Sequence, residues 1–233
     1  MSQPHAPIRL ADHVRACHIG DQMILLDLRR DKYVTIGGAH LPALAAAIAG
    51  QPSSPRLPDA WIHRLSRQQW LSDTPHTAPP RAPAQVEEPV DGLTMEDEDR
   101  AADEAWRDLG RLWHATLVAS RWRRRHSLGQ IAERVAALRR RHSRRTDDVA
   151  RDTMRIESAR YAYLRPFALT AQDRCLADSL TLILFLAKQG LFPRWVVGVR
   201  VGPFGAHSWV QDGDIVLNDL PERVRGYRPI LVV

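Results

Sequence analysis

The pattern of apolar and polar positions is clearest over the first seventy residues. Three short segments rich in apolar and β-branched residues, 14–19, 22–28 and 32–36, are separated by turn-like residues, which predicts a meander of three strands. Alanine and leucine then recur at helical spacing over residues 40–50. A second helix is predicted over 57–71, with one apolar side formed by Leu57, Trp61, Leu65 and Trp70. The pattern therefore predicts a small α+β module over residues 1–72.

The middle of the chain changes character twice. Residues 73–95 contain five prolines and few large apolar side chains, which is typical of a linker. A long helix is predicted over 96–125, with an apolar stripe of Trp106, Leu109, Trp113 and Leu117. Ser127 and Gln130 have the spacing of a capping box, so a further helix should begin there.

The C-terminal part has the pattern of a helix packed on a sheet. Residues 170–190 are apolar around a wide face and end at a glycine, which predicts a buried helix. Residues 194–202, 206–211 and 214–219 follow as three predicted strands. The order helix, strand, strand, strand places Cys175 near the start of a helix beneath an antiparallel sheet, so the second domain, 96–233, is also predicted to be α+β.

Composition narrows the class of protein. Of the 233 residues, 44% are hydrophobic, enough for a packed core, and Cys17 and Cys175 are too few and too far apart for a disulfide framework or a CxxC metal site. Neither a signal peptide nor an apolar run long enough for a bilayer is found, so we expect a cytoplasmic protein with no membrane contact. Two free thiols, no metal and no cofactor are expected.

Charge is unevenly distributed around a net value of +6. Residues 82–105 hold nine carboxylates and one arginine, whereas 121–145 hold ten arginines and one glutamate. A basic run of this kind is usually a solvated helix face, so we expect no nucleic acid as partner. An acidic protein surface is the better match for the arginines.

Candidate chemistry centres on Cys175. A helix N-terminus favours a thiolate over a thiol, and either Thr170 or Asp173 could cap this helix, which leaves the exact turn of Cys175 open. His207 follows 32 residues later (207 − 175) and Asp219 a further 12 (219 − 207). A nucleophile, a proton acceptor and a residue that orients the imidazole are what a Cys-His-Asp mechanism needs. The alternative is that Cys175 is a buried structural cysteine.

The motif "DRCLADSLTLILFLAKQGL…VVGVRVGPFGAHSWVQDGDIVLND" resembles the leader peptidases (B proteins) of lasso-peptide biosynthesis, a transglutaminase-like, papain-like cysteine peptidase family. Residues 14–71 resemble the winged-helix-like recognition module that is often fused to this peptidase. Two positions depart from the family pattern. Gln211 replaces a frequent glutamate, so that position should not be essential, and "QPSSP" at 51–55 replaces a middle helix.

The resemblance implies a function and a set of site residues. The chain would bind a lasso precursor through its leader peptide and cleave it, with Cys175 as nucleophile, His207 as base and acid, Asp219 as orienter and Gln172 as a candidate oxyanion donor. The freed core would pass to a separate ATP-dependent lasso cyclase. The leader would add to the edge of the third strand and contact the second helix, through Lys32, Tyr33, Val34, Thr35, Ile36, Trp61 and Leu65.

The orienter of His207 depends on strand register. A two-residue Asp212-Gly213 turn would place residue 211 opposite 214 and His207 opposite Asn218, whereas pairing 211 with 215 would place it opposite Asp219. The family spacing favours Asp219, and Asn218 remains the alternative. Two other functions also stay open: acyl transfer to an amine, and peptide binding without catalysis.

Overall fold

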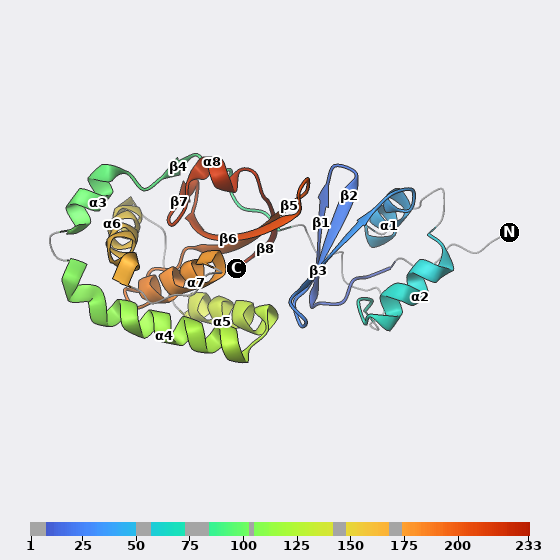
Figure 1. Cartoon of the computed structure of the whole chain (residues 1–233), viewed down its shortest axis with the longest axis horizontal. Coiled ribbons are helices and arrows are strands. Elements are labelled where there is room, and N and C mark those ends of the chain that lie inside the picture. Colours follow the sequence, from blue (N-terminus) through green and yellow to red (C-terminus); the bar gives the residue numbers. More distant parts are fainter. Residues whose placement is uncertain (1–7, 50–56, 73–83, 103–104, 142–147, 168–173) are drawn as a thin grey trace. The chain divides into compact units, whose positions relative to one another are not determined.

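The computed structural model describes residues 8–49, 57–72, 84–102, 105–141, 148–167 and 174–233 (Figure 1). The chain divides into two compact units, residues 1–84 and 85–233, each with its own sheet. The α+β prediction is confirmed for both units.

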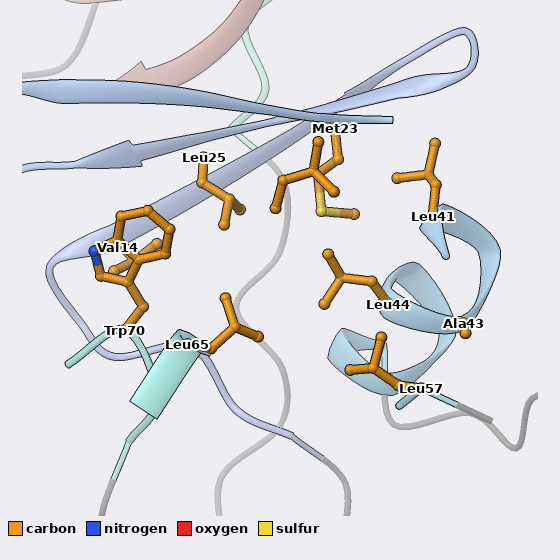
Figure 2. Close-up of a cluster of buried hydrophobic side chains, with 10 residues drawn as sticks. Val14, Met23, Leu25, Leu41, Ala43, Leu44, Leu57, Leu65 and Trp70 are labelled. Atoms are coloured by element: carbon orange, nitrogen blue, oxygen red, sulfur yellow. The ribbon is translucent and has the colours of Figure 1, made fainter. Parts of the chain in front are cut away.

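The first unit is built on the predicted three-stranded meander. Strands β1 (Val14–Ile19), β2 (Gln22–Asp27) and β3 (Lys32–Gly37) pair antiparallel in the order β1-β2-β3, and helices α1 (Leu41–Ile48) and α2 (Asp59–Arg67) follow. Figure 2 shows side chains from β2, α1 and α2 meeting on one side of the sheet. The buried members of this core are Val14, Met23, Leu25, Ile36, Leu41, Ala43, Leu44, Leu57, Leu65 and Trp70.

A buried carboxylate fastens the end of this sheet. Asp27 is 1% exposed and accepts hydrogen bonds from the Trp70 indole N–H (2.9 Å), the Arg30 guanidinium (3.0 Å) and the backbone N–H groups of Arg29 and Arg30. Burial raises the pKa of Asp27, but these donors outweigh it and hold the pKa below its usual value. The carboxylate therefore links the β2–β3 turn to Trp70, three residues beyond the end of α2.

The second unit contains a five-stranded sheet in the order β4-β7-β6-β5-β8. Its strands are β4 (Asp91–Gly92), β5 (Arg194–Arg200), β6 (Gly205–Asp212), β7 (Ile215–Val216) and β8 (Arg228–Val232). The β4–β7 pair is parallel and the other pairs are antiparallel. The helices are α3 (Met95–Ala102), η1 (Ala105–Asp108), α4 (Leu109–Arg125), α5 (Leu128–Arg141), α6 (Asp148–Leu164), η2 (Arg165–Phe167), α7 (Arg174–Ala187) and α8 (Pro221–Val224).

Helix α7 is the core helix of this unit, as its sequence predicts. Most of its apolar side chains are buried, and its Ser179 hydroxyl lies 2.7 Å from the Ser208 hydroxyl of β6. The indole N–H of Trp195 on β5 reaches both hydroxyls, at 3.0 and 2.9 Å. These buried polar groups satisfy one another, so they hold α7 against β5 and β6 in one position.

Two expectations for the region before α7 need correction. Residues 85–95 belong to the second unit rather than to a linker, because β4 pairs with β7 and Arg155 of α6 forms ion pairs with Asp91 (2.7 Å) and Asp97 (2.8 Å). The long helix over 96–125 is divided into α3, η1 and α4 in the described residues. The sequence pattern also did not predict helix α6 and strand β4 in this region, or strand β8 near the C-terminus.

Three of the four residues in the predicted apolar stripe face outward. Trp106, Trp113 and Leu117 are 64%, 52% and 66% exposed, and α4 instead buries Leu112, Ala115 and Ala119. The small alanines let α4 approach its neighbours closely, whereas the larger stripe was the more conspicuous signal in the sequence.

Candidate active site

Cys175 is the second residue of α7 and is half-buried. It lies in the first turn, where backbone N–H groups that have no partner inside the helix favour a negative charge on the thiol sulfur. The proposed caps Thr170 and Asp173, and the oxyanion candidate Gln172, lie outside the described residues. The described part of the chain therefore places the sulfur at the N-terminal end of a buried helix.

His207 on β6 forms a short contact with Asp219. The imidazole Nε2 lies 2.6 Å from Asp219 Oδ2, and the two side chains are only 13% and 9% exposed. The other carboxylate oxygen, Oδ1, accepts from the Leu220 backbone N–H at 2.8 Å and lies 3.1 Å from the Arg223 guanidinium. Because Nε2 is hydrogen-bonded to Asp219, the other ring nitrogen of His207, Nδ1, is the one available to Cys175.

The three groups influence one another's protonation. The hydrogen bond with His207 lowers the pKa of Cys175 and outweighs burial, which raises it. Burial lowers the pKa of His207, but its hydrogen bonds with Asp219 and Cys175 prevail and raise the pKa to about 9. Burial raises the pKa of Asp219, but its hydrogen bonds with His207 and the Leu220 N–H, together with the nearby positive charges of His207 and Arg223, hold the pKa below its usual value. A thiolate beside an imidazolium is therefore the favoured charge state.

Two aromatic rings flank the histidine. Trp209, two residues further along β6 on the same face, stacks toward His207 with ring centroids 6.2 Å apart, and the Tyr227 ring lies 5.1 Å away. Gly198 on β5 is the residue directly opposite His207. A Cβ atom at position 198 would lie 2.7 Å from the Trp209 ring, so the absence of a side chain there makes room for the indole.

Gln211 holds the indole in this place. Its amide oxygen accepts from the Trp209 indole N–H at 2.9 Å, and its amide nitrogen donates to the carbonyls of Glu87 and Gly213, both at 2.7 Å. The side chain is fully buried. The expectation that position 211 should not be essential did not include this structural role, because the sequence gives no sign of the three partners.

The expected β6–β7 register is wrong in both of its versions. Residue 211 pairs with 216 and 212 with 215, so the two-residue turn is Gly213-Asp214, with Gly213 at φ +58° in its first position. Regular pairing ends at Val216, and the expected strand over 214–219 is only two residues long. Asp219 reaches His207 from a loop beyond the strand, so turn register alone could not have selected it.

The proposed leader-binding residues occupy different positions in the first unit. Lys32 and Thr35 are exposed, Tyr33 and Val34 are half-buried, and Ile36 lies in the core. Trp61 is half-buried beside the Arg64 guanidinium, 5.3 Å from its ring centroid. Leu65 is 1% exposed, so its side chain supports α2 from inside and offers no surface for a peptide.

A family model supports the chemistry that this geometry suggests. Residues 116–232 match the transglutaminase-like superfamily, a stretch that includes Cys175, His207 and Asp219, and the chain therefore belongs to this superfamily. Its members are commonly cysteine-dependent enzymes and include cysteine peptidases and acyl transferases. Neither a curated protein nor a solved structure matches the chain significantly.

The described residues hold no group of three or more His, Cys, Asp or Glu side chains placed to bind a metal ion. None of the helices in this described part of the chain has the length and apolar character needed to cross a bilayer.

Proposed function

We propose that this chain is a cysteine endopeptidase that removes the leader peptide from a lasso-type precursor. The observation that carries the proposal is the coupling of Cys175, His207 and Asp219 at the start of a buried helix. Membership of a superfamily that includes cysteine peptidases supports the reaction class. The choice of a lasso precursor rests on the resemblance of residues 14–71 and 174–219 to the leader peptidases.

The reaction would pass through a thioester. The Cys175 thiolate attacks the carbonyl carbon at the leader–core junction, and a S–C bond forms as the carbonyl π electrons move to oxygen. When that intermediate collapses, the C–N bond breaks and the His207 imidazolium gives its proton to the departing core amine. Water then attacks the thioester as His207 takes its proton, and the leader leaves as a carboxylic acid with the thiolate restored.

The other residues would support this cycle. Asp219 holds the His207 ring through Nε2, which leaves Nδ1 to exchange the proton. The backbone N–H of Cys175 is proposed as an oxyanion donor, with Gln172 as the second candidate. Trp209 and Tyr227 keep water away from the sides of the imidazole, which strengthens its pairing with both partners.

Leader recognition is assigned to the first unit. In the described sheet β3 is a terminal strand, paired with β2 on one side, and two helices accompany the meander, an arrangement compatible with the winged-helix-like module. An extended peptide can add to such an edge through main-chain hydrogen bonds. The exposed side chains of Lys32 and Thr35 would then lie beside the leader, and Trp61 would contact it from α2.

The proposed second partner is the ATP-dependent lasso cyclase. The arginines that end α4, Arg121, Arg124 and Arg125, are exposed and would pair with an acidic surface on it. Association of the two proteins should then weaken as salt increases from low to near-physiological strength, because exposed ion pairs are screened. Association that is indifferent to salt would exclude an electrostatic contact.

The proposed function is tested by following a lasso-type precursor by mass spectrometry. The wild-type chain should yield separate leader and core peptides, and Cys175→Ala should yield none while it still binds the leader. Cys17→Ala, which alters a half-buried residue of β1, serves as the matched cysteine control and should cleave normally. Cleavage by Cys175→Ala would contradict the proposal, and crosslinked products would favour acyl transfer instead.

A further inference from the structure

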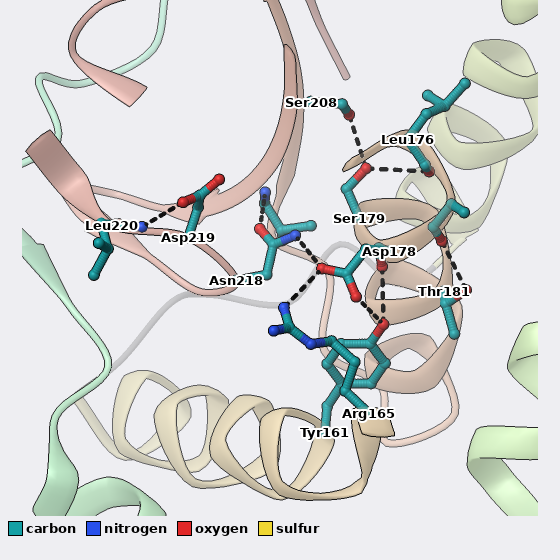
Figure 3. A network of polar contacts seen from close by, with 12 residues as sticks. Tyr161, Arg165, Leu176, Asp178, Ser179, Thr181, Ser208, Asn218, Asp219 and Leu220 are labelled. Atoms are coloured by element: carbon teal, nitrogen blue, oxygen red, sulfur yellow. Dashed lines mark hydrogen bonds and ion pairs between the residues drawn. The ribbon is translucent and has the colours of Figure 1, made fainter. Parts of the chain in front are cut away.

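A second set of polar side chains connects α7 to the loop that carries Asp219. Asp178 lies on α7 three residues after Cys175, so the two side chains are neighbours on the helix surface. Its Oδ2 accepts from the Asn218 side-chain amide at 3.1 Å, and its Oδ1 accepts from the Tyr161 hydroxyl at 2.8 Å (Figure 3). The Asp178 side chain is 15% exposed, so these bonds form largely away from solvent.

Asn218 continues this connection to β6. Its amide oxygen accepts from the Val210 backbone N–H at 2.8 Å, while the Val210 carbonyl accepts from the Leu217 N–H at 2.9 Å. The amide of Asn218 thus has one orientation, with its NH₂ toward α7 and its oxygen toward β6. Regular β6–β7 pairing ends at Val216. Beyond that point, the Asn218 side chain connects the loop to the backbone of β6.

Tyr161 and Arg165 also hold the Asp178 carboxylate in position. Tyr161 is buried on α6, and burial, reinforced by the neighbouring Asp178 charge, raises the pKa of its hydroxyl well above the usual value. The hydroxyl therefore stays protonated and acts as a donor to Asp178. Arg165 lies 3.4 Å from Oδ2 and supplies a partly exposed positive charge. With donors on both sides, the carboxylate remains an acceptor for Asn218.

We propose that Asp178 and Asn218 are positioning residues for the active site, which hold the Asp219 loop at a fixed distance from the helix that carries Cys175. Asp219 is the next residue after Asn218, and its contact with His207 depends on where that loop lies. The connection runs from the helix that carries Cys175, through the Asp178–Asn218 hydrogen bond, to the neighbouring Asp219. Asp219 in turn contacts His207. This inference rests on the proposed role of Cys175 as nucleophile, but it does not depend on which peptide is cleaved.

The proposal can be tested without a peptide, through alkylation of Cys175 by iodoacetamide in a Cys17→Ala background. The thiolate sulfur forms the new S–C bond and iodide leaves, so the rate as a function of pH reports the pKa of Cys175. Asn218→Asp keeps the acceptor for Val210 but places two carboxylates where an amide and a carboxylate now lie 3.1 Å apart. The loop should move, His207 should lose Asp219, and alkylation at pH 6 should slow about tenfold, as expected if the thiol pKa rises by about one unit.

Reversal of the donor and the acceptor should repair this defect. In the double variant Asp178→Asn/Asn218→Asp, an amide at 178 donates to a carboxylate at 218, which still accepts from Val210, so the wild-type pH profile should return. If Asp178 and Asn218 only stabilised the fold, the double variant should regain the thermal unfolding temperature of the wild type, but the pH profile of alkylation should not change between the variants. The profile is therefore the decisive readout.

Two further variants keep the test decisive. Asn218→Ser removes the long amide without adding charge and should also slow alkylation at pH 6 about tenfold, which covers the case in which Asn218→Asp does not fold. Thr181→Val removes a buried hydrogen bond to the Ala177 carbonyl (2.7 Å) on the same helix and should leave the profile unchanged. The proposal is overturned if the folded Asn218 variants alkylate like the wild type, or if the double variant stays as slow as Asn218→Asp.

Failure of this proposal and failure of the proposed function can be told apart. If the alkylation results are as expected but no precursor is cleaved, the positioning role stands and the substrate assignment falls. If the precursor is cleaved but the Asn218 variants react normally, the peptidase assignment stands and the positioning role falls.

Discussion

The Trp209 indole on β6 fills the space beside Gly198 of the neighbouring strand β5, where a side chain at position 198 would otherwise lie. A Cβ at position 198 would lie 2.7 Å from the Trp209 ring and 2.9 Å from Tyr227 Cβ. These are the two aromatic residues that flank His207. The close approach of β5 therefore determines how the imidazole is enclosed.

Gly198→Ala should consequently damage both stability and activity. The methyl group has no room, so Trp209 or Tyr227 must move, at a cost of about 1–3 kcal/mol in the free energy of unfolding. The displaced ring should no longer enclose His207, and kcat should fall. Chemical denaturation and peptide cleavage measure the two effects.

Gly110→Ala is the matched control for this change. Gly110 lies in the first turn of α4, and a Cβ added there would meet no neighbouring element within 4 Å, so alanine should fit without strain and should not lower the free energy of unfolding. Activity should be unaffected. If Gly198→Ala were as stable and active as Gly110→Ala, the account of the enclosure would be wrong.

The charge state of the site makes a prediction about pH. The pKa of His207 is raised from 6.5 to about 9, so its contribution to stability is fully present below 6.5 and is lost as the pH rises through about 9. The pKa of Cys175 is lowered, so the thiolate survives below the usual range of a thiol. The kcat/KM profile should therefore be bell-shaped, with a basic limb near pH 9. A profile that rises steadily through pH 9 would show that a neutral histidine acts with the thiolate.

Asp219 is expected to govern that profile. Asp219→Ala removes the 2.6 Å partner of Nε2, so the pKa of His207 should fall and turnover should drop by about a hundredfold or more. Glu222→Gln, which alters an exposed carboxylate of the adjacent α8, should behave like the wild type in the same cleavage assay. Equal activity in the two variants would remove Asp219 from the mechanism.

Leader recognition by strand addition predicts a specific sensitivity to proline. Proline has no backbone N–H, so prolines in the leader segment that pairs with Lys32–Ile36 should weaken binding to the full chain. Prolines placed in the core peptide should not. Isothermal titration with both sets of peptides measures the difference, and equal affinities for all of them would exclude pairing along β3.

Helices and strands with a clear apolar periodicity and turn residues at their ends were predictable from the sequence. The meander over 14–36 and the buried helix around Cys175 have strong periodicity and clear turn residues, and both are present. Strands β4 and β8 lacked such a signal, because two residues, or a segment containing a proline, give no pattern. Their formation depends on partners far away in the sequence.

In the candidate site, too, some residues were predictable from the sequence and others were not. Cys175 and His207 were identifiable by residue type and spacing, whereas the contact between His207 and Asp219 depends on a loop that the turn register misplaced. Gln211, Asp178 and Asn218 act through side-chain hydrogen bonds, and a sequence does not show which polar groups meet in a core. A lone aspartate inside the apolar sequence of α7 was the one available sign of Asp178.

The most direct test of the central claim is hydrolysis of a lasso-type precursor in ¹⁸O-labelled water, followed by mass spectrometry. Thioester hydrolysis at Cys175 predicts two peptides whose masses sum to that of the precursor plus one water, with the label at the new carboxyl end of the leader. Cys175→Ala should give neither product. A leader without the label, or one joined to an amine, would show that the thioester is not resolved by water and would contradict the assignment as a peptidase.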